Sequence, residues 1–397
     1  MRLAGRMERI GTETAFEAAA RARALEATGR EVIHLEIGEP DFDTPVDIKR
    51  AASEALLDGG MTHYTAPTGI AELREAIAAD ASRRKGIHVT PERIVVTPGA
   101  KPIMFYAMLA LLEPGDEVIY PNPGFPIYES MIRFVGGDAV AAPLREGREF
   151  RMDVDEVASL VTDRTRMIVI NTPHNPTGSV LTDDDLRAIA DVALDRDLVV
   201  LADEIYGRLQ YDGEFSSIAA LPGMEERTIV LDGFSKTYAM TGWRLGYGIV
   251  PESLTLAFSR LVINSVSCTS AFSQAGAVAA LTGPQDDADA MREEFRARRQ
   301  LVVDRLNRIE GVTCVMPHGA FYAFPNISAF EMTSAAMADH LLDDAGVSCL
   351  AGTAFGAHGE GFLRLSYANS RENLSRALDL IEASLARLPA AAPVAAR

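Results

Sequence analysis

The stretch LVVLADEIY, residues 198–206, followed by TIVLDGFSK, residues 228–236, decides the fold class. Each begins with a short run of apolar, mostly branched residues, which is typical of a strand buried on both faces. Four similar runs lie around them: RIVVTPG at 93–99, DEVIYP at 116–121, MIVINTP at 167–173 and RLGYGIV at 244–250. Helical stretches separate several of these runs, so we predict an α/β fold with a mainly parallel sheet between two helical layers.

A second domain is expected in the C-terminal part, because 397 residues exceed what one hydrophobic core usually supports. After about residue 283 the alternation gives way to a long charged helix, expected over 286–308. Short β-rich runs with helices between them follow, and they predict a smaller α+β domain. These runs are VTCVMP at 312–317, FYAFPNI at 321–327, VSCLAG at 347–352 and FLRLSYA at 362–368.

The N-terminal segment is expected to pack with this smaller domain. It combines a polar helix with HLEIGEPDFDTP, residues 34–45, whose Gly and Pro content is typical of a crossing segment. The Ala/Pro-rich end of the chain has no periodic apolar face and is expected to be flexible. We therefore predict a large domain over 47–285, a discontinuous small domain over 1–46 and 286–387, and a tail over 388–397.

The composition argues against several classes of function. A net charge of −18 at pH 7 repels phosphate backbones and anionic membrane surfaces, so neither nucleic acid nor a membrane is an expected partner. The three cysteines lack the spacing of a zinc or redox motif, which favours a reducing cytoplasm. No signal peptide or membrane-spanning run is visible, and the seven scattered histidines predict no catalytic metal.

The motif GFSKTYAMTGWRLG, residues 233–246, places a lysine at the end of a predicted strand and an arginine eight residues later. It resembles the cofactor-lysine signature of class I and II aminotransferases, which use pyridoxal 5′-phosphate. That cofactor needs a primary amine for its aldehyde and a hydrogen-bonding cation for its phosphate. The resemblance implies Lys236 as the covalent anchor, with Arg244 and Ser235 at the phosphate.

Two further motifs precede this signature in the order found in fold-type I aminotransferases. In LADEIYGRL, Asp203 ends an apolar strand, where a carboxylate without a partner would be costly to bury. The resemblance implies that Asp203 holds a proton on the pyridine nitrogen, which keeps the ring an electron sink. Tyr206, and Asn175 in NTPHNPTG, are implied at the cofactor's 3′-oxygen.

The segment VVTPGAKPIMF reads as a strand, a turn and a helix start, an arrangement whose free N–H groups favour a phosphate. Gly99, Ala100 and Lys101 are therefore the candidate phosphate cradle. Phe125, in PNPGFPIYE, matches the family position of an aromatic side chain stacked on the cofactor ring, with core packing as the competing interpretation.

Three more residues complete the candidate site by resemblance. HYTAPTG places Tyr64 where the family's tyrosine reaches the partner subunit's phosphate, which implies a homodimer with shared active sites. LEIGEPDFDTP places Gly38 at the substrate carboxylate. FLRLSYA places Arg364 on a strand with apolar neighbours, where it would bind the substrate α-carboxylate; a structural ion pair is the alternative.

These motifs predict transamination between an L-amino acid and a 2-oxo acid by a ping-pong mechanism. The same scaffold hosts β-lyases, decarboxylases and oxidases, which remain alternatives, whereas a regulator would need a DNA-binding module that the chain has no spare length to hold. Substrate identity depends on Lys101. It meets the distal carboxylate of aspartate, glutamate or 2-oxoglutarate, or it is a solvated lysine in a site for neutral side chains.

Overall fold

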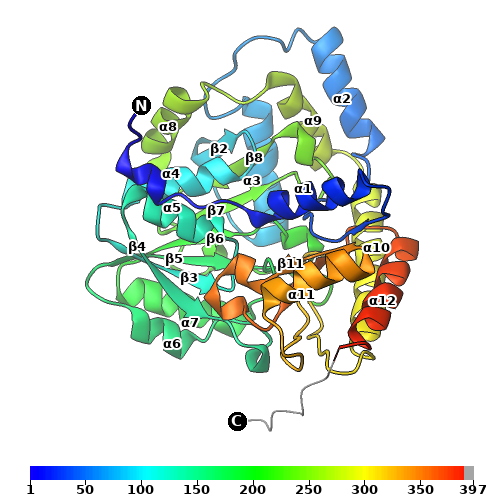
Figure 1. The fold of residues 1–397 in the computed structure, drawn as a ribbon. Helices are drawn as coiled ribbons and strands as arrows, with labels where there is room; N and C mark the ends of the chain where they lie inside the picture. The colour runs from blue at the N-terminus through cyan, green and yellow to red at the C-terminus, as the bar shows by residue number, and fades with distance from the viewer. Residues whose placement is uncertain (389–397) are drawn as a thin grey trace.

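The computed structural model describes residues 1–388; the predicted tail beyond Leu388 lies outside the described residues. Its centre is a seven-stranded sheet in the order β2-β8-β7-β6-β5-β3-β4 (Figure 1). β8 alone runs in the direction opposite to the other six strands, so the prediction of a mainly parallel sheet is confirmed. The strands are β2 Ile94–Thr97, β3 Glu117–Asn122, β4 Asp138–Pro143, β5 Thr165–Asn171, β6 Val199–Asp203, β7 Thr228–Gly233 and β8 Gly246–Ile249.

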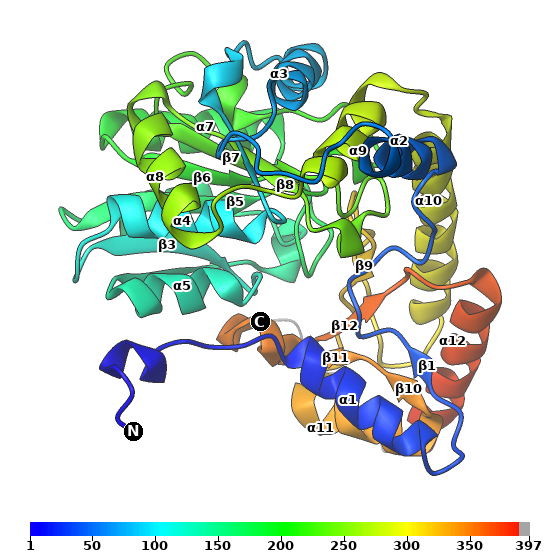
Figure 2. The same ribbon diagram turned by 90° about the horizontal axis from the view of Figure 1, so that it is seen from above.

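Helices cover both faces of this sheet, as Figure 2 shows. Alternate residues of a strand face opposite sides: Leu201 packs toward α4, α5 and α8, whereas Val200 and Ala202 pack toward α7. Both faces are therefore apolar, which explains the continuous apolar runs in the sequence. These helices, with their neighbours, are α2 Val46–Leu57, α3 Ala71–Lys85, α4 Lys101–Leu111, α5 Ile127–Val135, α6 Val154–Leu160, α7 Asp183–Asp195, α8 Thr255–Ser265 and α9 Ala271–Thr282.

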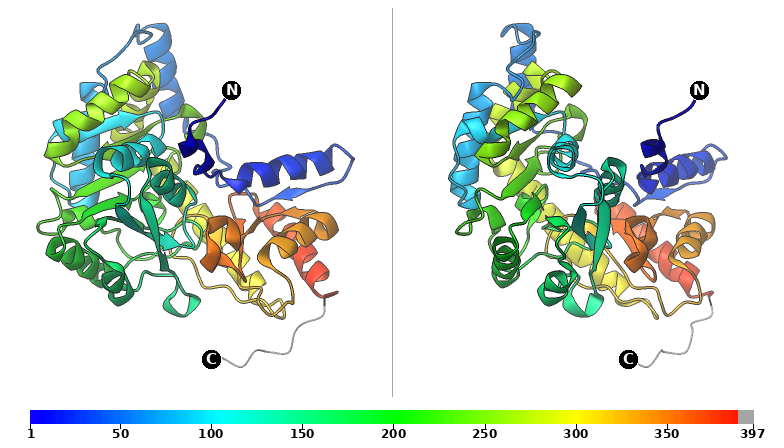
Figure 3. Two further views of the ribbon diagram at one scale, coloured as in Figure 1. Left: turned by 60° about the vertical axis from the view of Figure 1, so that its left-hand side comes forward. Right: turned by 90° about the vertical axis from the view of Figure 1, so that its left-hand side faces the viewer.

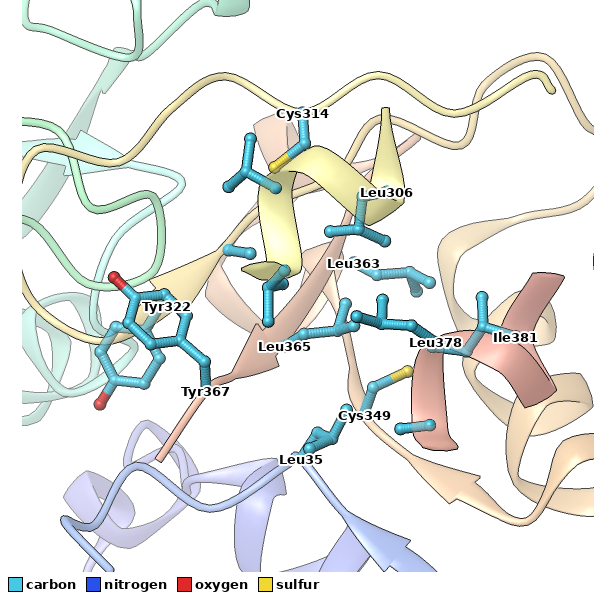
Figure 4. Packing of buried hydrophobic residues seen from close by; sticks show 14 of the residues in the cluster. Leu35, Leu306, Cys314, Tyr322, Cys349, Leu363, Leu365, Tyr367, Leu378 and Ile381 are labelled. Atoms are coloured by element: carbon cyan, nitrogen blue, oxygen red, sulfur yellow. The ribbon is translucent and has the colours of Figure 1, made fainter. Parts of the chain in front are cut away.

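The N-terminal segment packs with the C-terminal part of the chain. Figure 3 shows α1 beside the C-terminal helices and strands, apart from the central sheet. β1 pairs in parallel with β10, and Leu35 joins a core with Leu306, Leu365 and Ile381 (Figure 4). The elements of this part are α1 Thr14–Glu26, β1 Ile33–His34, α10 Asp286–Leu306, β9 Tyr322–Ala323, α11 Ser334–His340, β10 Val347–Ser348, β11 Leu350–Ala351, β12 Leu363–Ser366 and α12 Arg371–Leu385.

One expected strand does not form. The run at 312–317 makes an isolated bridge between Thr313 and Asn326 and no regular ladder. The amide side chain of Asn307 takes the place of a strand partner: it accepts a hydrogen bond from the Cys314 N–H at 2.8 Å and donates one to the Cys314 carbonyl at 3.0 Å. Satisfied in this way, the backbone needs no sheet neighbour at this point.

The topology brings the chemistry-bearing loops together. β5, β6 and β7 are parallel neighbours, so Asn171, Asp203 and Gly233 end their strands at one edge of the sheet. The start of α4 follows β2 and meets the same edge, since Gly99 and Ala100 lie against Gly246 at the start of β8. Within residues 1–388 no helix is long and apolar enough to cross a membrane.

Candidate active site

A cavity of about 510 Å³ lies at this edge, between the sheet, the N-terminal segment and the C-terminal part. All the predicted site residues except Gly99 and Tyr64 line it. Those lining residues are Gly38, Ala100, Lys101, Phe125, Asn175, Asp203, Tyr206, Ser235, Lys236, Arg244 and Arg364. Residues drawn from seven separate motifs are thus brought into one space, as expected for a binding site.

Lys236 follows β7 and points its amine into the cavity. The Nζ atom donates to the carbonyl of Gly38 and lies 5.7 Å from the centre of the Phe321 ring. Burial lowers the pKa of Lys236 to about 8; the cations of Arg364 and Lys101 add to this effect, and the carboxylates of Glu39 and Glu13 oppose it. A larger share of this amine is therefore neutral, and nucleophilic, than of a solvated lysine at the same pH.

Asp203 ends β6 with 6% of its surface exposed. Its carboxylate accepts a hydrogen bond from the Tyr128 hydroxyl at 2.7 Å and another from the Ile205 N–H at 3.3 Å. Burial nevertheless raises the pKa of Asp203 to about 6. Because both of these donors are neutral, a ligand that brings a positive charge would stabilise the ionised carboxylate. Sequence analysis missed Tyr128, because its contact with Asp203 joins residues 75 positions apart.

The start of α4 and the arginine after β7 form a cradle. Gly99 has a φ of +81°, and a side chain there would collide with the guanidinium of Arg244. Arg244 donates to the Thr241 carbonyl at 2.8 Å through one nitrogen, and buried Ser235 lines the same space. Free N–H groups at a helix start, a hydroxyl and a guanidinium make up a donor set that suits a phosphate.

Arg364 lies on β12 with 4% of its surface exposed. Its guanidinium carbon is 4.6 Å from the centre of the Tyr322 ring and 4.9 Å from that of Phe355. One nitrogen reaches Asn175 Oδ1 at 3.4 Å, another donates to the Glu36 carbonyl, and Nε has no hydrogen-bond partner within the described chain. None of these contacts is an ion pair, so this buried cation still lacks an anion.

Tyr322 is a second residue of the cavity wall that the sequence did not reveal. Its hydroxyl lies 2.8 Å from that of Tyr206, and both rings are buried in the cavity wall. A Cβ at Gly38 would overlap the Tyr322 hydroxyl, so glycine is needed for this close approach. The run FYAFPNI predicted only a strand, since no local pattern distinguishes this tyrosine from a core aromatic.

Three predicted residues, Phe125, Lys101 and Tyr64, have surroundings that the sequence did not specify. Phe125 is half-buried and packs edge-on against Tyr128, with ring centres 5.7 Å apart. The Lys101 amine lies 5.3 Å from the centre of the Phe125 ring and pairs with the carboxylate of Glu13, which sequence analysis had not selected. Tyr64 lies outside the cavity, 89% exposed in the segment between α2 and α3.

The residues present fit pyridoxal phosphate. Lys236 offers an amine for its aldehyde, the Gly99–Arg244 cradle offers donors for its phosphate, and the buried carboxylate of Asp203 lacks a cation that a pyridinium would supply. These three demands are met within one cavity. No group of residues suited to hold a metal ion is found within residues 1–388.

Comparison with known proteins gives a consistent family. The sequence profile of the family described as aminotransferase class I and II matches residues 30–381. Aromatic-amino-acid aminotransferase 2 of Thermococcus litoralis is 44% identical, covering 88% of this chain and 91% of the relative. Aspartate aminotransferase of Rhizobium meliloti is 40% identical, covering 97% and 96%. The structure of Thermus thermophilus aspartate aminotransferase with maleate superimposes with a TM-score of 0.93 at 37% identity, covering 97% of this chain and 100% of that one.

Proposed function

The chain belongs to the class I and II aminotransferase family, and from this premise we propose that Lys236 anchors pyridoxal phosphate and carries the proton transfers of the reaction. The enzyme transfers an amino group between an L-amino acid and a 2-oxo acid. One observation carries the assignment of Lys236: its amine has a pKa lowered to about 8 and shares a cavity with the buried, uncompensated carboxylate of Asp203.

The roles of the surrounding side chains follow from their chemistry. When bound, pyridoxal phosphate supplies an electron sink that stabilises negative charge at the substrate Cα. Lys236 Nζ, neutral in an appreciable fraction near pH 8, would take the proton from Cα and deliver it to the cofactor carbon that had carried the aldehyde. Asp203 keeps a proton on the ring nitrogen, and Asn175 and Tyr206 are the proposed partners of the 3′-oxygen.

The substrate is held at its α-carboxylate by Arg364, whose buried guanidinium contacts no carboxylate within residues 1–388. Gly38 lies near this point, because it packs against the hydroxyl of Tyr322, whose ring centre is 4.6 Å from the Arg364 guanidinium carbon. The relatives are named for aspartate and for aromatic amino acids, and the Thermus structure holds a dicarboxylate. We propose aspartate or glutamate with 2-oxoglutarate as one substrate pair, with Lys101 at the distal carboxylate.

The proposed assembly is a cytoplasmic homodimer with shared active sites. Tyr64 is 89% exposed, and Val46 and Leu57 on the preceding helix α2 are exposed at 57 and 76%. Large apolar side chains in this number favour a covered surface. Cys268, Cys314 and Cys349 are free thiols, as expected in a reducing compartment.

Chemical trapping tests the proposal most directly. The purified holoenzyme is reduced with borohydride and digested, and the cofactor should remain on the peptide that contains Lys236. In parallel, formation of a 2-oxo acid is followed with aspartate, glutamate and phenylalanine as donors. Label on another lysine would refute the anchor, and loss of the amino acid without a matching new amino acid would refute transamination.

A further inference from the structure

The segment before α1 is attached to α5, and its last residue, Glu13, lines the cavity. In Figure 2 the chain runs alongside α5 before it enters α1. The Gly11 N–H donates to Ser130 Oγ at 2.8 Å, and Arg9 reaches the Phe134 carbonyl at 3.4 Å. These contacts hold the following residues, Glu13 to Phe16, against the wall of the cavity.

Glu13 turns its side chain into this cavity. It occupies the N-cap position of α1, where a carboxylate would ordinarily accept hydrogen bonds from the first N–H groups, yet its side chain makes no such bond. Instead its carboxylate pairs with the amine of Lys101. The Glu13 side chain is 19% exposed and that of Lys101 50%, so the pair lies at the border between cavity and solvent.

This pairing changes what the cavity offers to a substrate side chain. The wall carries four basic residues, of which Lys236, Arg244 and Arg364 have proposed roles at the cofactor and at the α-carboxylate. Lys101 is the remaining cation for a second carboxylate, and Glu13 already neutralises it. A dicarboxylate must separate the pair or bring its own charge beside Glu13, and both cost free energy.

A neutral side chain meets no such cost. With the pair closed, the surface around it is formed by the half-buried ring of Phe125, which lies under the Lys101 amine, and by Phe16 on α1. An aromatic or aliphatic side chain can pack on these rings without disturbing the ion pair.

We propose that Glu13 is a specificity-determining residue that serves as an internal counter-ion of Lys101, so that neutral side chains bind with the ion pair closed and dicarboxylates only with the pair opened. The inference rests on the proposed function, because it assumes that the substrate α-carboxylate lies at Arg364. The proposal implies that the enzyme binds both neutral and dicarboxylic substrates, and that Glu13 sets the ratio of the two affinities.

Binding of two inert acids to the holoenzyme tests this without turnover. Calorimetry compares maleate, a dicarboxylate, with 3-phenylpropionate, a monocarboxylate whose aromatic side chain is uncharged. Both acids are measured with the wild type and with Glu13→Gln. The amide keeps the shape of the side chain and removes its charge. Maleate should bind about ten-fold more tightly to Glu13→Gln, while 3-phenylpropionate should change by less than about two-fold.

Two further variants separate this role from others. Glu17→Gln removes the same charge from an exposed position one turn further along α1, outside the cavity wall, and should leave both affinities unchanged. In a Lys101→Met background, Glu13→Gln should raise the affinity for maleate by less than it does when Lys101 is present. Equal changes for both acids would mean that Glu13 only fastens the segment, and would overturn the proposal. Such a result would leave the trapped lysine and the measured transamination intact, so the two failures are distinguishable.

Discussion

Two lysines, the partly buried Lys236 and the fully buried Lys85, lie on opposite sides of the same strand ends. Lys236 faces the cavity, where its Nζ donates to a backbone carbonyl. Lys85, at the end of α3, lies on the other side and contacts Glu204 at 2.6 Å and Asp232 at 2.7 Å. Burial lowers the pKa of Lys236 to about 8. For Lys85 burial acts in the same direction, but the two carboxylates outweigh it and the pKa is raised.

The carboxylates are divided in the same way. Asp203 ends β6 and Glu204 follows it directly, and successive side chains of an extended chain point to opposite sides. Glu204 accepts from Lys85 and from Ser217 on the rear side, whereas Asp203 receives only neutral donors on the cavity side. The groups on the cavity side, which contact no opposite charge in the described part of the chain, are therefore the candidates for chemistry. The ion-paired groups on the rear side stabilise the fold instead.

The largest expected effect is the loss of turnover in Lys236→Ala. Without the amine, activity should fall by at least about 10⁴-fold, the upper range for a single acid–base group. Thermal unfolding should be almost unchanged, because little core volume is lost. Steady-state kinetics and calorimetry of the same preparation check both statements, and a variant that lost stability in step with activity would erase the contrast with Lys85.

Lys85→Met should have the opposite profile. It leaves Glu204 and Asp232 facing each other without a cation, which should cost about 3–5 kcal/mol in the free energy of unfolding. Urea denaturation of the cofactor-free protein measures this loss. Lys49→Met is the matched control, since Lys49 is 48% exposed and its distance to Asp43 is 3.9 Å. A loss no larger than in the control would show that the rear cluster contributes little.

Substitutions of the adjacent carboxylates Asp203 and Glu204 test the same comparison. Asp203→Asn should still bind cofactor but turn over roughly 10²-fold more slowly, because an amide cannot hold the ring nitrogen protonated. Glu204→Gln should retain chemistry and lose stability, since it removes an acceptor of Lys85. Turnover numbers and free energies of unfolding are measured for both variants. If each variant lost both activity and stability to the same extent, the two adjacent carboxylates would not have separate roles.

The smallest expected effect is a pH dependence of stability in the cofactor-free protein. The pKa of Lys236 is about 8 when folded, below its ordinary value of 10.5, so the unfolded chain binds more protons between these pH values. Its contribution to the free energy of unfolding should therefore rise with pH from about 8 to 10, by roughly 2 kcal/mol relative to Lys236→Met. Chemical denaturation at several pH values measures the difference, and a falling difference would contradict the lowered pKa.

Much of the fold could be predicted from local sequence. The runs that became β2, β3, β5, β6, β7 and β8 are short, apolar and flanked by turn residues, and these properties suit a strand buried on both faces wherever it lies in the sheet. The long charged helix was also expected, and α10 ends within two residues of the predicted end. The run at 312–317 failed, because the side chain of Asn307 satisfies backbone groups that a strand would have paired.

The candidate site divides along the same line. Lys236, Arg244, Asp203 and Asn175 follow predicted strands or lie within ordered motifs, so their place at one edge of the sheet could be inferred. Tyr128 lies in PNPGFPIYE and Tyr322 in FYAFPNI, but neither pattern assigns these tyrosines to the site, and Glu13 stands in no motif at all. They enter the site through contacts with Asp203, Tyr206 and Lys101 that span 75, 116 and 88 residues.

By itself, the sequence determined six of the seven strands of the sheet, all but β4, and which side chains stand at its carboxyl edge, because both follow from period and order along the chain. Only the tertiary structure decided which charges meet. Lys85, Lys101 and Lys236 are the same residue type, yet one is paired in the interior, one is paired at the cavity mouth and one faces the cavity without a carboxylate contact within residues 1–388. The energy of a charge depends on its burial and its neighbours, and these are set by segments that are distant in the chain.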